Sequence, residues 1–192
     1  MKKILVATSN PGKLREIQEI LKDYQFVTLE DINCKIEVNE DQETFEGNAK
    51  KKAKKIGDVT NMPCIADDSG LCIKAFNNWP GVHTARFLGE KSTPTQRNKA
   101  ILEKMKYLKQ DERKANVECV VVYYENGKFI IARGHMEGKI AQQPRGKNGF
   151  GFDSIFELNN GKTYAELSQE EKNRISHRKR ALENLQKQLT NK

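Results

Sequence analysis

The residues best suited to chemistry are two adjacent aspartates, Asp67 and Asp68, which follow a short apolar run. Carboxylates held at the end of a buried strand can bind Mg²⁺, which prefers oxygen ligands and usually keeps several waters. Acidic residues are equally common in turns before a Ser-Gly pair, which here occupies positions 69–70. Taken alone, the two aspartates therefore indicate a metal site and an ordinary turn about equally.

A second candidate is the segment from Thr8 to Lys13, which ends in a Gly-Lys pair. The apolar residues before it predict a strand, and Asn10-Pro11 is typical of the start of a helix. Free amides, the positive end of the helix dipole and the Lys13 ammonium would then form an anion site. The GxxxxGK[ST] pattern is absent, so a capped helix with a solvated lysine remains the alternative.

A glycine-rich loop carries two phenylalanines and an aspartate in the run Gly149 to Asp153. Glycines beside aromatic residues suggest a backbone that approaches a flat ligand, with a ring available to stack on it. The alternative, which the residues alone favour slightly, is a flexible loop anchored by core aromatics.

Basic residues form two further groups, and for both the simplest interpretation is a solvated surface. The lysines between Lys50 and Lys55 predict a solvated helix face. Lys172, His177 and Arg178 fall in the last predicted helix and could line a pocket, although such residues usually serve only solubility.

The hydrophobic pattern predicts the elements that must position these residues. Strands are expected at 3–8, 26–29, 63–67, 71–76, 115–124, 128–133 and 154–158, and helices after Asn10, Thr44, Thr93 and Ser168. Residues 68–70 are expected to turn, Asn126-Gly127 to form a hairpin, and a capping box at 168–171 to open one helix to about Leu189. Parallel and hairpin signals together favour an α/β domain with a mixed sheet.

Two apolar stripes support these helices. One comprises Phe45, Ala49, Ala53 and Ile56, and the other Ile175, Leu182, Leu185 and Leu189.

Composition bounds the function classes. The 192 residues include 34 Lys plus Arg and 26 Asp plus Glu, a formal net charge of +8. No apolar stretch approaches the about 20 residues of a membrane span, and no secretory leader follows the first methionine. The four cysteines form no CxxC pair, so reduced thiols and a cytoplasmic location are expected. The charge suggests a polyanionic partner without choosing one.

Six blocks in a fixed order resemble one family. They are Thr8-Ser9-Asn10 with Lys13, TFEGNA at 44–49, ADDSGL at 66–71, PGVHTARF at 80–87, GFGFD at 149–153 and AELSQEEKNRISHR at 165–178. Their sequence resembles the inosine triphosphate pyrophosphatase family, which acts on non-canonical purine nucleoside triphosphates such as dITP and XTP. The resemblance runs from residue 4 to about 185, and its most specific blocks are DDSGL and the block that contains SHR.

The resemblance implies Mg²⁺-dependent hydrolysis between the α and β phosphates, which gives a nucleoside monophosphate and pyrophosphate. It also implies one domain over residues 1–192, with an elongated mixed β-sheet flanked by helices. Two lobes would enclose a central cleft, and the protein would be a homodimer that binds no nucleic acid and no membrane.

The resemblance also gives each candidate residue a role. Asp68 would be the general base and a metal ligand, Glu40 the second metal ligand, and Ser69 a neighbour of the substrate. The residues that would hold the triphosphate are Thr8, Ser9, Asn10, Gly12 and Lys13. The base would meet Phe150, Gly151, Phe152 and Asp153, and be recognised by Lys172, His177 and Arg178.

The helix start at residue 44 departs from the family pattern. Gly47 stands where the family usually has Glu, so a carboxylate is missing and Thr44 loses its capping-box partner. The segment 39–43 is also one residue shorter than usual. Glu43 is therefore an alternative to Glu40 as the second ligand.

Base selectivity is expected to depend on hydrogen bonding. Inosine and xanthosine present a 6-keto acceptor where adenosine presents an amine donor. Donors such as Arg178 and Lys172 would be left unsatisfied by the amine, at a cost on the order of 1–3 kcal/mol.

Two other functions fit parts of the sequence. A pyrophosphatase of the related Maf type would prefer pyrimidine or modified nucleotides, but the full SHR block argues against it. A nucleic-acid-binding module could use the lysine face and the C-terminal helix, and its binding would weaken steeply with salt. No DNA- or RNA-binding signature accompanies the charge, and few aromatic residues lie among the basic ones.

Overall fold

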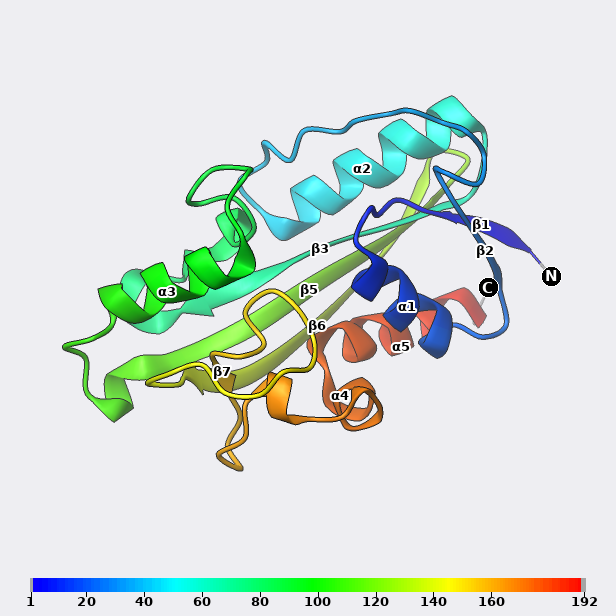
Figure 1. The fold of residues 1–192 in the computed structure, drawn as a ribbon. Helices are drawn as coiled ribbons and strands as arrows, with labels where there is room; N and C mark the ends of the chain where they lie inside the picture. The colour runs from blue at the N-terminus through cyan, green and yellow to red at the C-terminus, as the bar shows by residue number, and fades with distance from the viewer. Residues whose placement is uncertain (1, 191–192) are drawn as a thin grey trace. The chain divides into compact units, whose positions relative to one another are not determined.

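The computed structural model describes residues 2–190, whose strands form one mixed sheet (Figure 1). The strands are β1 (Lys3–Val6), β2 (Gln25–Thr28), β3 (Cys64–Ile73), β4 (Trp79–Pro80), β5 (Lys114–Glu125), β6 (Lys128–Ile140) and β7 (Phe156–Glu157). Over this part of the chain the sheet has seven strands, in the order β2-β1-β3-β5-β6-β7, with β4 beside β3. β1 pairs parallel with β2 and β3, whereas β4 and β7 pair antiparallel. The predicted mixed α/β sheet is confirmed.

The chain divides into two compact units. The first comprises Met1–Asp68, Cys119–Gly134 and His177–Lys192, and the second Ser69–Glu118 and His135–Ser176. β3, β5 and β6 each contribute residues to both units.

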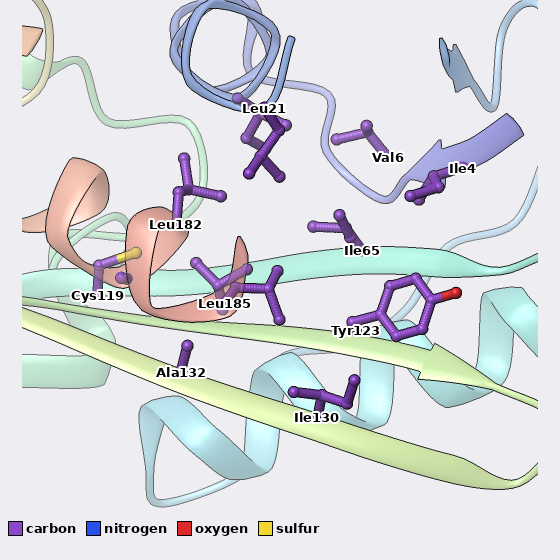
Figure 2. Packing of buried hydrophobic residues seen from close by; sticks show 13 residues of the cluster. Ile4, Val6, Leu21, Ile65, Cys119, Tyr123, Ile130, Ala132, Leu182 and Leu185 are labelled. Carbon is purple, nitrogen blue, oxygen red and sulfur yellow. The ribbon is translucent and has the colours of Figure 1, made fainter. Parts of the chain in front are cut away.

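In the first unit, α1 (Pro11–Ile20) and α5 (His177–Thr190) bury their apolar sides against one face of the strands. Figure 2 shows this cluster, in which Ile4, Val6 and Leu21 lie near Leu182 and Leu185. Full burial of one such apolar side chain stabilises the folded state by roughly 1.5–3 kcal/mol relative to leaving it exposed. Ile17 of α1 and Leu21, the residue that follows this helix, are fully buried in the cluster.

The helix α2 (Phe45–Thr60) lies in the same unit and begins where the sequence predicts. The Thr44 hydroxyl accepts a hydrogen bond from the Gly47 amide at 3.0 Å, which satisfies one of the free amides of the first turn. The stripe expected to face inward is buried: Phe45, Ala49, Ala53 and Ile56.

The second unit has its own apolar core around α3 (Pro94–Lys104). Thr93 caps this helix through a capping box with Gln96. Ile101 and Met105 are buried among residues of β3, β5 and β6 and of the segment that follows β7. A short helix, α4 (Gln169–Ile175), begins at the Ser168 capping box that the sequence predicts.

The hairpin between β5 and β6 is confirmed. Asn126 and Gly127 have φ values of 49° and 78°, and the commonest two-residue hairpin turn needs positive φ at both positions. The return strand is longer than expected, because β6 continues to Ile140.

The predicted turn at residues 68–70 is wrong, and the two short strands around it are one strand, β3. Its two ends pair with β1 and β4, and β5 is its neighbour on the other side in the strand order. Local turn preferences therefore yield to the sheet.

The predicted single C-terminal helix is also wrong, since it breaks at Ser176, whose ψ of 151° is extended. Its apolar stripe serves two cores: Ile175 packs with the core of the second unit, and Leu182 and Leu185 with that of the first. The strand expected at 154–158 is shortened to β7. None of the helices in residues 2–190 is long and apolar enough to cross a bilayer.

Candidate functional site

Asp67 is the centre of a buried charge cluster in the first unit. Its Oδ2 lies 2.9 Å from the Lys13 ammonium and 3.3 Å from Nη2 of Arg178, and the Cys119 thiol donates to it at 3.9 Å. Burial alone would raise the pKa of this carboxyl, but the charges of Lys13, Arg178 and Lys52 hold it well below its usual range. Asp67 is therefore an ion in the folded protein.

The Arg178 guanidinium belongs to the same cluster and is only 2% exposed. Its Nη1 donates to Glu16 Oε2 at 2.5 Å. Burial would lower its pKa, but Asp67, Cys119 and Glu16 raise it above the ordinary value, so the side chain stays charged. Arg178 thus contacts Asp67, the same carboxylate that binds Lys13. The role of Arg178 in base recognition stays a prediction.

Asp68 has different surroundings, although it adjoins Asp67 in β3. Its Oδ2 accepts a hydrogen bond of 2.9 Å from the amide of Asn48 on α2. Burial raises its pKa, with the Glu40 carboxylate acting in the same direction and Lys52 opposing both. The carboxyl is thus more basic than an exposed aspartate.

Lys52 is a site residue that the sequence analysis missed, because it lies within the lysine run assigned to solvent. Its ammonium bonds Glu40 Oε1 at 2.5 Å and the carbonyl of Asp67 at 2.6 Å, and its side chain is 12% exposed. Burial would lower its pKa, but Asp67, Glu40 and Asp68 raise it. The four-residue spacing from Asn48 could have separated Lys52 from the outward lysines, since both then share one helix face.

The loop before α1 is organised by its own side chains. Asn10 caps the helix and accepts from the amides of Gly12 at 2.9 Å and Lys13 at 3.4 Å, and Thr8 Oγ1 accepts from the Asn10 amide. The cap is confirmed. The amides expected to be open for an anion are engaged by it, which leaves Lys13 and the helix dipole as the positive features. Ser9 is exposed.

In the second unit, Lys172 and Asp153 form a buried ion pair of 2.8 Å. Asp153 also accepts from the Phe150 amide at 2.7 Å, which closes the loop on itself. The Lys172 ammonium lies 4.4 Å from the centre of the Phe150 ring, within the range of a cation–π contact. Lys172, Asp153 and Phe150 thus form one cluster that combines an ion pair with an aromatic ring.

The glycines of this loop pack mainly against the protein. A Cβ on Gly149 would lie 2.1 Å from Asp153 Oδ2, and one on Gly146 would lie 2.1 Å from the backbone of Ala165. A Cβ on Gly151 would meet nothing within 4 Å, and its carbonyl accepts from Asn98. Phe152 packs on the core of the second unit, so part of the loop is anchored as the simpler alternative proposed.

Two remaining residues occupy unit boundaries. Ser69 is half-buried and continues β3 directly after Asp68. His177 is buried and opens α5. A Cβ on Gly134 would lie 2.1 Å from the His177 carbonyl oxygen, so β6 lies directly against the start of this helix.

The two carboxylates that the sequence analysis assigns to a metal, Asp68 and Glu40, both lie in the first unit. Among the residues described, no group of three or more His, Cys, Asp and Glu side chains is arranged to hold a metal. The Lys52 ammonium contacts both Glu40 and the carbonyl of Asp67, the neighbour of Asp68, and the charge of Glu40 raises the pKa of Asp68. This donor set fits Mg²⁺, which is usually held by one or two carboxylates together with waters and substrate phosphates. Glu43 is exposed, whereas Glu40 is partly buried.

Comparison with known proteins gives one family. The Ham1 family model matches residues 4–188. A dITP/XTP pyrophosphatase of Clostridium perfringens is 41% identical over 199 residues, and one of Bacillus subtilis 40% over 193, with 98% of each chain covered in both cases. A HAM1 protein from Coxiella burnetii has a similar structure, with a TM-score of 0.91, 40% identity and full coverage of both chains. The Ham1 protein of Staphylococcus aureus gives 0.89 at 34% identity, with 99% of each covered.

Proposed function

Because the chain belongs to the Ham1 family, we propose that it hydrolyses dITP, XTP and ITP to the nucleoside monophosphate and pyrophosphate. The enzyme would remove non-canonical purine nucleotides from the pool and so keep them out of DNA and RNA. Its curated relatives named dITP/XTP pyrophosphatase support this substrate class.

The observation that carries the proposal is the charge cluster of the first unit. A triphosphate is strongly anionic, and cleavage of its anhydride requires charge neutralisation more than covalent chemistry. The Lys13 side chain is 16% exposed while its partner Asp67 is buried, so this lysine keeps some contact with solvent. We assign the phosphates to Lys13 and the loop residues Thr8, Ser9, Asn10 and Gly12.

Asp68 is the proposed general base, because burial makes its carboxyl a better proton acceptor. Asp68 and Glu40 would hold Mg²⁺. When bound, this cation would neutralise phosphate charge and acidify a coordinated water. The greater burial of Glu40 supports it over Glu43 as the second ligand. Ser69 is expected beside the substrate.

The base is assigned to the second unit and to the residues at the start of α5. The Phe150 ring offers a stacking surface, and the Lys172 ammonium beneath it can donate to a 6-keto oxygen. Gly151, Phe152 and Asp153 complete the proposed wall. His177 and Arg178 are proposed to act on the same end of the nucleotide, with Arg178 held by its carboxylate partners.

Three further features belong to the proposal: one domain with a central cleft, assembly as a homodimer and a cytoplasmic location. The first two follow from the family resemblance, and the third from the cysteine pattern of the sequence.

The decisive experiment measures pyrophosphate release from dITP beside dATP and dGTP, with Mg²⁺ and with EDTA. We expect rapid release from dITP, slow release from the other two, and loss of activity in EDTA. Equal rates on the three nucleotides, or activity that ignores the chelator, would exclude the proposed function.

A further inference from the structure

We propose that Asn48 is a positioning residue, which fixes Asp68 relative to the segment that carries Glu40. The inference rests on the proposed function, because it concerns the two carboxylates assigned to the metal. It concerns residues of the first unit alone.

The Asn48 side chain is fully buried and uses both ends of its amide. Its Nδ2 donates to Asp68 Oδ2 at 2.9 Å, and its Oδ1 accepts from the backbone amide of Gln42 at 3.0 Å. A backbone amide can only donate, so it holds the oxygen end of the side chain and directs the NH₂ group to Asp68. One side chain thus joins β3 to a position two residues from Glu40.

Lys52 repeats this connection one turn along the same helix. Its ammonium bonds Glu40 and the backbone carbonyl of Asp67. Asn48 and Lys52 are four residues apart and therefore share one face of α2. This face of α2 contacts both β3 and the segment 40–42 at two points. One contact is made by the neutral amide of Asn48 and the other by the charged ammonium of Lys52.

Gly47 allows the segment 40–42 to lie close to the start of α2. A Cβ at this position would lie 2.8 Å from Gln42 Cβ and 3.1 Å from Thr44 Oγ1. Gln42 Cβ is fixed to its backbone, so relief of the clash would move the amide that binds Asn48. The glycine that replaces the usual family glutamate is thus part of the arrangement around Asp68.

The test compares Mn²⁺ binding, followed by the electron paramagnetic resonance signal of the free ion, with the Mg²⁺ concentration that gives half-maximal dITP hydrolysis. Residues that hydrogen-bond metal ligands typically change metal affinity about 10- to 100-fold when removed. We expect Asn48→Ala to raise the Mn²⁺ dissociation constant and the half-maximal Mg²⁺ concentration by this factor. Gly47→Ala and Gly47→Glu should raise both values too, although the second substitution restores the carboxylate usual in the family.

Asn116→Ala is the matched control. Asn116 is also buried, and its amide donates to Glu118 at 2.7 Å in the second unit. This variant should lose stability but keep the metal affinity of the wild type. If Asn48→Ala does not fold, the two Gly47 variants decide the question.

Metal constants of the folded Asn48 and Gly47 variants within twofold of the wild type would overturn the inference while the wild type still hydrolyses dITP. A wild type that neither hydrolyses dITP nor responds to Mg²⁺ would instead overturn the proposed function, and the inference with it.

Discussion

At the scale of single residues, two neighbouring aspartates have opposite electrostatic environments. Asp67 is bound by a lysine and an arginine, and its pKa is lowered despite full burial. Asp68 is bound by a neutral amide and lies near another carboxylate, and its pKa is raised. The first suits an ion that holds other side chains in place, and the second suits a proton acceptor.

We expect Asp68→Asn to lower kcat for dITP by roughly 10²- to 10⁴-fold, the usual contribution of a general base. The amide keeps the shape of the side chain but cannot take a proton. Nucleotide affinity, measured by calorimetry, should remain measurable in this variant. Retained turnover would place the base elsewhere.

Asp67→Asn should instead destabilise the fold by about 3–5 kcal/mol at pH 7, because Lys13 and Arg178 would lose their shared buried counter-charge. The folded pKa of Asp67 is lowered, so its stabilising effect is complete above its unfolded value of about 3.9 and is lost as the pH falls below it. Denaturant unfolding at several pH values should show the gap between wild type and variant narrowing below about pH 4.

Asp58→Asn is the control for this measurement, since Asp58 is an exposed aspartate of α2. It should leave the free energy of unfolding close to that of the wild type. If Asp67→Asn lowers the free energy of unfolding as little as Asp58→Asn does, the Asp67 cluster does not stabilise the protein.

At the scale of elements, the sequence predicts best what short-range signals decide. The caps at Asn10, Thr44 and Thr93 and the hairpin at 126–127 each depend on a few neighbouring residues, and each is confirmed. The continuity of β3 and the break at Ser176 depend on pairing and packing with distant segments. No local pattern encodes these.

The candidate site follows the same division. The family blocks identify Asp68 and Lys13, but they leave Lys52 within a run of similar residues. The hydrophobic stripe of α2 shows which face is apolar, and only the folded structure shows that Lys52 meets Glu40 and Asp67. Sequence spacing places Lys52 on the same helix face as Asn48, but it does not identify the distant residues that Lys52 contacts.

The contact between β6 and α5 gives a prediction for Gly134→Ala. The added Cβ would lie 2.1 Å from the His177 carbonyl oxygen and 2.5 Å from the Ala181 amide nitrogen, both backbone atoms. We expect a loss of about 1–3 kcal/mol in unfolding free energy, the usual cost of overpacking. Arg133→Ala, at the exposed adjacent position, should cost less than about 1 kcal/mol. Equal stability of the two variants would contradict the close packing.

At the scale of the whole molecule, the net charge of +8 is mostly a surface property. Exposed pairs such as Lys54–Asp58 and Lys51–Asp41 account for much of the α2 lysine run. The cations that we assign to the substrate, Lys13, Lys172 and Arg178, are among the less exposed ones.

Binding of dITP should therefore stabilise the protein more than binding of dATP, which carries the same triphosphate charge. With Asp68→Asn, which should not turn substrate over, dITP and Mg²⁺ at about 100 times Kd should add about 2.7 kcal/mol. For a chain of this length that is a rise of roughly 5–10 °C in Tm. Differential scanning fluorimetry with equal concentrations of dITP and dATP checks this, and equal shifts would contradict selection of the base.

The unbroken course of β3 also limits how this segment can vary in length. Successive side chains of a strand point to opposite faces of the sheet. Asp67 accordingly shares a face with Ile65 and the α1–α5 core, and Asp68 turns toward Asn48 of α2. A one-residue insertion or deletion before Asp67 would exchange the two carboxylates between these faces. In a scan of variants, β3 should therefore accept conservative substitutions at many positions but no indel upstream of the aspartates.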